Sequence, residues 1–163
     1  MNTFGFNAYL MYFKTIPLPL DLNQPQAEAS LRKASIKESM TLDFKFKAVD
    51  IGTDKLFYGL EGKKDLKFTR LKTSFEFFMP KLIVSLPKDS LANCYRIRPG
   101  AVTIATIGLL GFAMFAGLVG ILRRTTDLAT FSPFLIIIGI YTLLFFLEIN
   151  ITLRKINKAF SKP

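Results

Sequence analysis

Two apolar stretches decide the fold class: residues 101–122 read AVTIATIGLLGFAMFAGLVGIL, and residues 133–153 read PFLIIIGIYTLLFFLEINITL. The first contains no charged residue, and the second contains only Glu148. A helix of about 20 apolar residues crosses the hydrocarbon core of a bilayer, so both stretches are long enough. Residues 123–132 (RRTTDLATFS) form a short polar link between them. The pattern predicts a transmembrane helical hairpin; the alternative is a pair of core helices in a soluble protein.

The composition of the 163-residue chain limits the chemistry that it can perform. It contains no His, so the commonest general base and metal ligand is missing. Cys94 is the single cysteine, which excludes an intramolecular disulfide and a multi-thiolate metal site. The sequence also lacks a Walker loop and a G-x-G-x-x-G motif. We therefore expect no metal, no cofactor and no enzymatic activity.

Residues 1–98 are predicted to form a cytoplasmic α+β domain, long enough for its own core. Residues 25–35 (PQAEASLRKAS) are good helix formers and follow a proline-containing extended stretch. A period-two alternation then predicts an antiparallel β-meander of four to five strands. The expected strands cover residues 42–46, 56–61, 66–73, 77–86 and 94–98. Residues 1–13 are interpreted as an edge strand, with an interfacial anchor as the alternative.

Three short motifs in the domain resemble those of a known family. They are Phe57-Tyr58-Gly59, Phe68-Thr69-Arg70 and Phe78-Met79-Pro80. This pattern of F-x-G, F-x-R and F-x-P before a hydrophobic hairpin resembles an uncharacterised family of small bacterial inner-membrane proteins, over most of the chain after Gln24. The resemblance implies a helix, a β-meander and a two-span hairpin (residues 99–155), and it implies no activity.

The distribution of basic residues predicts the orientation of the hairpin. Four basic residues shortly precede the first span and four follow the second, whereas the link between the spans contains only two, Arg123 and Arg124. The eight flanking residues are Lys81, Lys88, Arg96, Arg98, Arg154, Lys155, Lys158 and Lys162. Cytoplasmic segments carry the excess of Lys and Arg, so both termini are expected in the cytoplasm of a bacterium, with residues 156–163 as a basic tail.

The net charge of +10 points to anionic lipid headgroups rather than nucleic acid, since the chain is already held in a bilayer. Candidate residues for binding the membrane surface are basic and belong to the domain or follow the second span. They are Lys45, Lys47, Lys63, Lys64, Lys67, Arg96, Arg98, Arg154 and Lys155.

Small residues recur along the first span and are candidates for close helix packing. They are Ala101, Ala105, Gly108, Ala113, Ala116, Gly117 and Gly120. Their partner is either the second span of the same chain or a second molecule, and the sequence leaves both open.

Glu148 is the only ionisable residue well inside a predicted span. Tyr141, Thr152 and Lys155 share its helix face at spacings of seven, four and three. One interpretation is a snorkelling carboxylate neutralised by Lys155 or by a partner on the first span. The other is an ion or proton site, because charges inside a membrane are costly and often functional.

These features predict a membrane-anchored, non-enzymatic binding or scaffold module with a basic cytoplasmic domain. Its partners would be anionic headgroups or an acidic protein. Two alternatives remain: a membrane-disrupting effector whose spans oligomerise, and an accessory or immunity subunit of a larger membrane complex.

Overall fold

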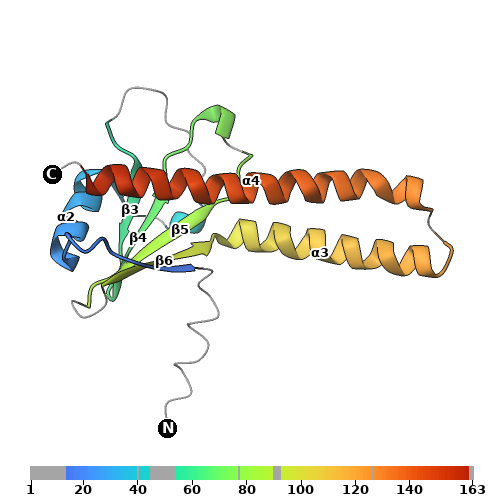
Figure 1. The fold of residues 1–163 in the computed structure, drawn as a ribbon, viewed down its shortest axis with the longest axis horizontal. Helices are drawn as coiled ribbons and strands as arrows, with labels where there is room; N and C mark the ends of the chain where they lie inside the picture. Colours follow the sequence, from blue (N-terminus) through green and yellow to red (C-terminus); the bar gives the residue numbers. More distant parts are fainter. Residues whose placement is uncertain are drawn as a thin grey trace, which may run out of the picture.

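The computed structural model describes residues 14–39, 41–44, 54–76, 78–89, 93–125 and 127–161. A sheet with a short helix forms one end, and two long helices project from it (Figure 1). The strand expected within residues 1–13, and Lys45 and Lys47, lie outside the described residues.

The described strands form one six-stranded mixed sheet of order β1-β6-β5-β4-β3-β2. Its strands are β1 (Lys14–Pro17), β2 (Ser35–Glu38), β3 (Phe57–Glu61), β4 (Asp65–Arg70), β5 (Leu82–Pro87) and β6 (Cys94–Pro99). The predicted antiparallel meander is confirmed for β3 to β6. The description of the whole sheet as antiparallel is wrong, because β2 pairs with β3 in parallel. β1 adds an antiparallel edge strand beside β6.

Several predicted element boundaries differ from the structure. The strands predicted over residues 66–73 and 77–86 are shorter, at Asp65–Arg70 and Leu82–Pro87. The first helix, α2 (Gln24–Lys33), ends before Ser35, where the chain enters β2. The strand expected from residue 42 is instead a 3₁₀ turn, η1 (Leu42–Phe44). Leu42 is buried in a small cluster with Tyr58 and Ile83 on one face of the sheet, and tertiary contacts of this kind override a short period-two pattern.

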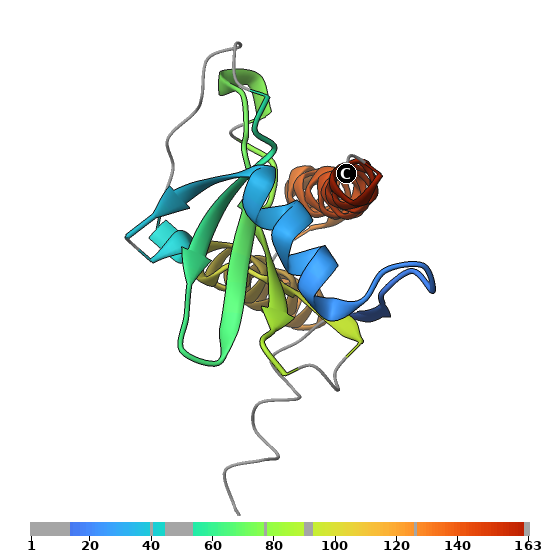
Figure 2. The same ribbon diagram turned by 90° about the vertical axis from the view of Figure 1, so that its left-hand side faces the viewer.

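α2 has a complete N-terminal capping box. The Asn23 side chain accepts a hydrogen bond from the Gln26 N–H, and the Gln26 side chain accepts one from the Asn23 N–H. Ala27 and Leu31 of this helix are fully buried against Phe57 and Phe68 of the sheet. Figure 2 shows α2 and the C-terminal part of α4 on the same side of the sheet.

The two long helices are α3 (Ala101–Leu122) and α4 (Leu128–Phe160). α4 begins five residues before Pro133, because the Asp127 side chain accepts a hydrogen bond from the Thr130 N–H and caps it. Pro133 cannot donate to the Ala129 carbonyl one turn earlier. The Ser132 hydroxyl donates to that carbonyl instead, at 3.0 Å, so the helix continues through the proline.

α4 is much longer than the expected second span. Its 33 residues extend about 50 Å at 1.5 Å per residue, against about 33 Å for the 22 residues of α3. The additional length lies over the sheet, where Ile156, Ala159 and Phe160 are buried in the domain core (Figure 1). The segment expected as a tail thus contributes its first residues to the last turns of α4.

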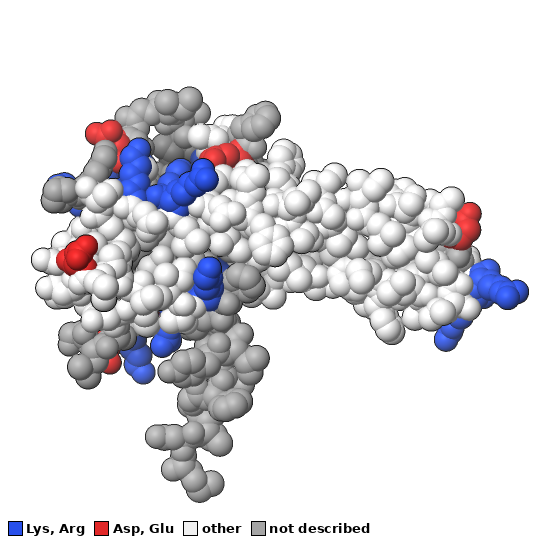
Figure 3. Space-filling view, in the orientation of Figure 1, with Lys and Arg blue, Asp and Glu red and all other residues white. Residues whose placement is uncertain are grey.

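Both long helices are long and apolar enough to cross a membrane. In the most apolar 18-residue segment of α3 no residue is buried, and in the corresponding segment of α4 only 11% of the residues are buried. Large side chains such as Leu109, Phe112 and Leu143 are 70–72% exposed. On the face visible in Figure 3, no charged side chain lies on the hairpin between the sheet and the hairpin tip.

Candidate functional site

A buried ion pair joins the sheet to α4. Arg70 ends β4, and its guanidinium donates from Nε to Glu148 Oε1 at 3.0 Å and from Nη2 to Oε2 at 2.6 Å. Both side chains are only 1% exposed. Two parallel hydrogen bonds between a guanidinium and a carboxylate are the strongest geometry that such a pair adopts. The pair therefore fixes the rotation and height of α4 on the sheet.

The F-x-R motif explains why Arg70 reaches α4. Successive side chains of a strand alternate between faces, so Leu66, Phe68 and Arg70 all point to the same face. Leu66 and Phe68 are buried in the core that α4 covers. Arg70 was not among the residues selected from the sequence, although this alternation was a signal for it.

Three further charged residues surround the pair. Glu76 Oε1 lies 2.7 Å from Arg70 Nη1, and Lys72 Nζ donates to the Met79 and Pro80 carbonyls at 2.5 and 3.1 Å. Lys155 Nζ donates to the Leu71 carbonyl at 3.4 Å. The sequence suggested that Lys155 or a residue of the first span neutralises Glu148. In the structure Lys155 bonds a carbonyl, and Glu148 pairs with Arg70 of the sheet.

The electrostatics of this cluster favour the charged forms of Arg70 and Glu76. Burial opposes the charge on Arg70, but the hydrogen bonds and charges of Glu148 and Glu76 outweigh it and raise the pKa of the guanidinium. Burial also opposes ionisation of Glu76, but the Arg70 guanidinium and the Thr73 N–H lower the pKa of this carboxyl. Burial lowers the pKa of both Lys72 and Lys155.

A second junction fixes α3 to the same end of the sheet. Asp43 accepts hydrogen bonds from both terminal nitrogens of Arg98, at 3.2 and 3.0 Å, and from the Ala101 N–H at 2.9 Å. Thr103 accepts from the Lys81 N–H at 2.7 Å and donates to the Lys81 carbonyl at 3.0 Å. Burial opposes ionisation of Asp43, but the hydrogen bonds from Arg98 and the Ala101 N–H outweigh this effect. The pKa of the Asp43 carboxyl is therefore lower than its usual value. Each helix of the hairpin is thus bonded to the sheet by side chains.

The structure does not bring the candidate membrane-surface residues into one patch. Lys63 and Lys64 lie in the β3–β4 turn, next to the Glu61–Leu66 pair. The hairpin leaves the opposite end of the sheet, where Leu82 pairs with Pro99. Lys67 and Arg96 lie within strands, and Arg98 is engaged by Asp43. Arg154 and Lys155 lie on the part of α4 that covers the sheet.

The candidate packing residues of α3 divide into two groups. Ala101, Ala113, Gly117 and Gly120 are half-buried, whereas Ala105, Gly108 and Ala116 are exposed. A Cβ on Gly117 would lie 2.0 Å from the Phe131 ring, so Gly117 serves the contact with α4. A Cβ on Gly108 would meet nothing within 4 Å.

Tyr141 and Thr152 lie on the same helix face of α4 as Glu148. Tyr141 interacts with the side chains of Thr106 and Thr103 on α3. Thr152 is fully buried, and its Oγ1 has no hydrogen-bond partner within the described residues.

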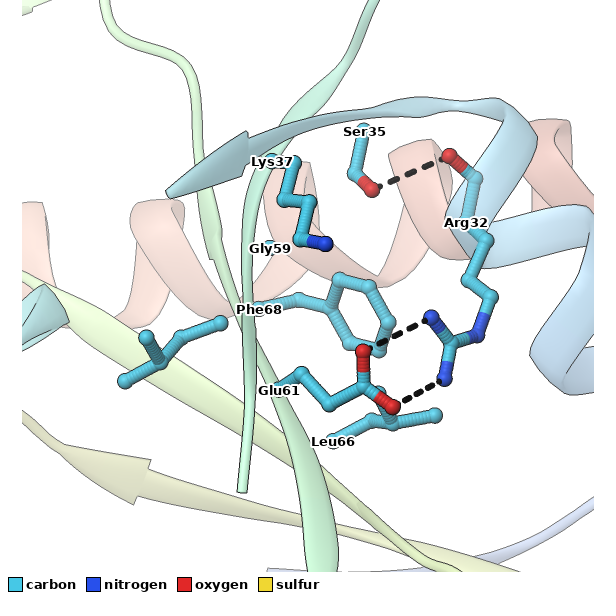
Figure 4. Close-up of a pocket in the computed structure, with 8 residues that line it drawn as sticks. Arg32, Ser35, Lys37, Gly59, Glu61, Leu66 and Phe68 are labelled. Carbon is cyan, nitrogen blue, oxygen red and sulfur yellow. Dashed lines mark hydrogen bonds and ion pairs between the residues drawn. The ribbon is translucent and has the colours of Figure 1, made fainter. Parts of the chain in front are cut away.

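A small cavity lies between α2 and the β2–β3 edge of the sheet (Figure 4). Its volume is about 180 Å³, below the range of about 300–1,000 Å³ usual for drug-sized ligands. The Arg32 guanidinium is paired across it with Glu61 at 2.9 Å. Hydrogen bonds from Arg32 and Lys88 lower the pKa of Glu61 to about 2. Of the two cationic side chains that line this cavity, Arg32 is thus already paired with carboxylates, and Lys37 is the other.

No family model matches the chain, and no curated protein or solved structure does either. Within the described residues, no three His, Cys, Asp or Glu side chains group as metal ligands. The Arg70–Glu148 pair is the ion pair with the lowest exposure of both partners among the described residues, at 1% for each side chain.

Proposed function

We propose that this protein is a two-span membrane protein that holds its six-stranded sheet against the cytoplasmic face of a bilayer as a non-enzymatic binding module. The observation that carries this proposal is the division of α4. Its first part exposes large apolar side chains, its last part is buried in the domain core, and Glu148 lies where the two parts meet.

The helix lengths support this placement. A hydrocarbon core of about 30 Å needs about 20 helical residues, and α3 has 22. Counted from Leu128, 20 residues of α4 end at Leu147. Glu148 then lies at the membrane boundary on the same side as Ala101, the first residue of α3. A carboxylate at this level and paired with Arg70 avoids the cost of a charge at the membrane centre.

The exposure of the hairpin also supports a bilayer around it. Water-soluble proteins rarely expose contiguous apolar patches above a few hundred Å². Both helices of the hairpin carry exposed Leu, Ile and Phe, among them Phe115, Leu122, Ile136 and Phe146. A lipid environment satisfies such a surface, whereas a core helix would bury it.

The module would present a basic end to the cytoplasm. Lys63 and Lys64 lie at the end of the sheet away from the hairpin, where an acidic protein partner can reach them and headgroups cannot. The exposed Arg154 lies seven residues, or about 10 Å, past Leu147, which is the headgroup level. The two basic regions thus suit different partners.

Cysteine labelling in intact bacterial cells tests the orientation. A Thr125→Cys variant should react with a membrane-impermeant maleimide, and the native Cys94 should react only after the cells are opened. Labelling of Cys94 alone in intact cells would refute the cytoplasmic placement of the sheet.

Photo-crosslinking tests the binding module. A photoreactive residue at position 64 should give discrete adducts in cells, and the adducts should disappear when Lys63 is reversed to Glu. The same photoreactive residue at the exposed position 125, across the membrane, is the control. Identical adducts from both positions, or none from position 64, would contradict the proposal.

A further inference from the structure

The β4–β5 loop exposes one large aromatic side chain beside the start of the hairpin. Phe78 is 82% exposed. Outside the two long helices, Leu20 is the only other large hydrophobic residue exposed to this degree in the described chain. The loop sequence, LKTSFEFFMPK over residues 71–81, contains further phenylalanines. Figure 1 shows the loop, with its short helical turn η2 (Ser74–Glu76), at the end of the sheet from which α3 and α4 depart.

Backbone hydrogen bonds fix the height of this loop relative to α3. The Gly100 N–H donates to the Lys81 carbonyl at 2.8 Å, and Thr103 bonds both backbone groups of Lys81. Phe78 is three residues before Lys81, so it lies within about 11 Å of it along an extended chain. Interfacial side chains enter a bilayer by about 5–10 Å, so Phe78 lies within reach of the membrane boundary at Ala101.

Hydrogen bonds join the two ends of this loop to each other and to its described residues. Lys72 Nζ bridges the two stems by donating to the Met79 and Pro80 carbonyls. The Met79 N–H donates to the Glu76 carbonyl at 3.1 Å, and the Thr73 N–H donates to the Glu76 side chain at 3.1 Å. The ammonium of Lys72 is thus used inside the loop. The described exposed residues of the loop are Thr73, Ser74 and Phe78, so its exposed surface is uncharged and carries one large apolar side chain.

We infer that the β4–β5 loop is an interfacial anchor that places Phe78 among the lipids beside the hairpin. This inference rests on the proposed membrane placement of α3 and α4. The occupant that we assign to Phe78 is the bilayer itself, because Lys81 at the end of the loop is bonded to Gly100 and Thr103 at the start of α3, the level of the proposed membrane boundary. Phe78 would give the sheet a third contact with the membrane, lateral to the two spans, and so would hold the sheet at a fixed tilt.

Tryptophan fluorescence tests the inference directly, since the chain contains no Trp. A Phe78→Trp variant of the full chain is reconstituted into vesicles of phosphatidylcholine and phosphatidylglycerol, with or without brominated acyl chains. Two matched variants carry Trp elsewhere. Leu143→Trp reports a side chain of α4 that is 70% exposed, and Leu20→Trp reports an exposed side chain near the end of the sheet away from the hairpin.

The three variants separate the possible outcomes. We expect brominated lipid to quench the fluorescence of Phe78→Trp and Leu143→Trp and to leave that of Leu20→Trp unchanged. For Phe78→Trp, bromines near the headgroup should quench more strongly than bromines deeper in the acyl chains. Quenching of Leu143→Trp without quenching of Phe78→Trp would overturn the anchor and leave the hairpin in the membrane. Quenching of neither would overturn the proposed function as well. A blue-shifted but unquenched Phe78→Trp would assign the tip to a protein contact and also overturn the anchor.

Discussion

We expect the Arg70–Glu148 pair to contribute measurably to the free energy of unfolding of the chain. Both side chains are 1% exposed, so replacement of one leaves the other buried without its main partner. Breaking such a pair typically costs about 3–5 kcal/mol. For Glu148→Leu we expect the lower end, about 3 kcal/mol, because Glu76 remains 2.7 Å from Arg70. Arg70→Met should cost more, because within the described residues Arg70 is the one cation that forms hydrogen bonds with Glu148.

The double variant distinguishes an ion pair from simple packing. Apolar replacements of similar volume at both positions are often neutral or stabilising, so Arg70→Met with Glu148→Leu should be within about 1 kcal/mol of the wild type. Thermal unfolding in detergent micelles, followed by circular dichroism, measures this. At about 2–4 °C per kcal/mol, Glu148→Leu should lower Tm by roughly 6–12 °C, and the double variant should recover most of it.

The control and the refuting result are equally specific. Glu28→Gln removes a partner of Arg32 from an exposed pair, and should cost less than about 1 kcal/mol. If the double variant loses the sum of the two single losses, the two residues are not coupled. The junction would then not be what fixes α4 to the sheet.

Three further predictions follow from particular contacts. Ile156→Ala should destabilise the sheet domain by about 2–5 kcal/mol in the same unfolding assay, because this side chain of α4 is fully buried; a similar truncation at an exposed neighbour should have little effect. Gly117→Ala should lower Tm, because its Cβ would collide with the Phe131 ring, whereas Gly108→Ala should leave Tm unchanged or raise it. Equal effects of the two variants would contradict the contact between Gly117 and Phe131. The pKa of Glu61 is lowered from 4.5 to about 2, so its contribution is present above pH 4.5 and is lost as the pH falls towards 2. Glu61→Gln should therefore flatten the decline in Tm over this pH range and no other.

The sequence predicted the elements whose signals are local. Long apolar runs predicted the two long helices, and the proline and helix formers after Gln24 predicted α2. The strand predicted over residues 66–73 appeared as β4, although it ends at Arg70. These signals depend on residues within one element, so no knowledge of the tertiary arrangement is required.

The parts that were not predicted depend on contacts between distant residues. β2 is only four residues long and is defined by its parallel partner β3, with no pattern of its own. η1 replaces a predicted strand because Asp43 bonds Arg98 and Ala101, which lie 55 and 58 residues later. Arg70 and Glu148 are separated by 78 residues, so only the fold brings them together.

The continuation of α4 over the sheet did have a signal in the sequence. Ile149, Ile156, Ala159 and Phe160 recur at helical spacing and continue the buried face past Leu153. The prediction nevertheless ended the helix at Leu153, because the charged residues among 154–158 interrupt the apolar run that defines the span. A helix that leaves a membrane and enters a domain core changes from an all-round apolar surface to a one-sided one.

The depth of α4 in a bilayer is the measurement that tests the account most directly. Nitroxide labels are placed singly at the exposed positions Leu143, Arg154 and Lys158 of the full chain in lipid nanodiscs, and their collision with oxygen and with a water-soluble nickel complex is measured. We expect oxygen to be favoured at Leu143 and the nickel complex at Arg154 and Lys158, because the helix in the proposed placement leaves the lipid near Glu148. Preference for the nickel complex at Leu143, or for oxygen at Arg154, would contradict a helix that passes from the membrane into the core of the sheet domain.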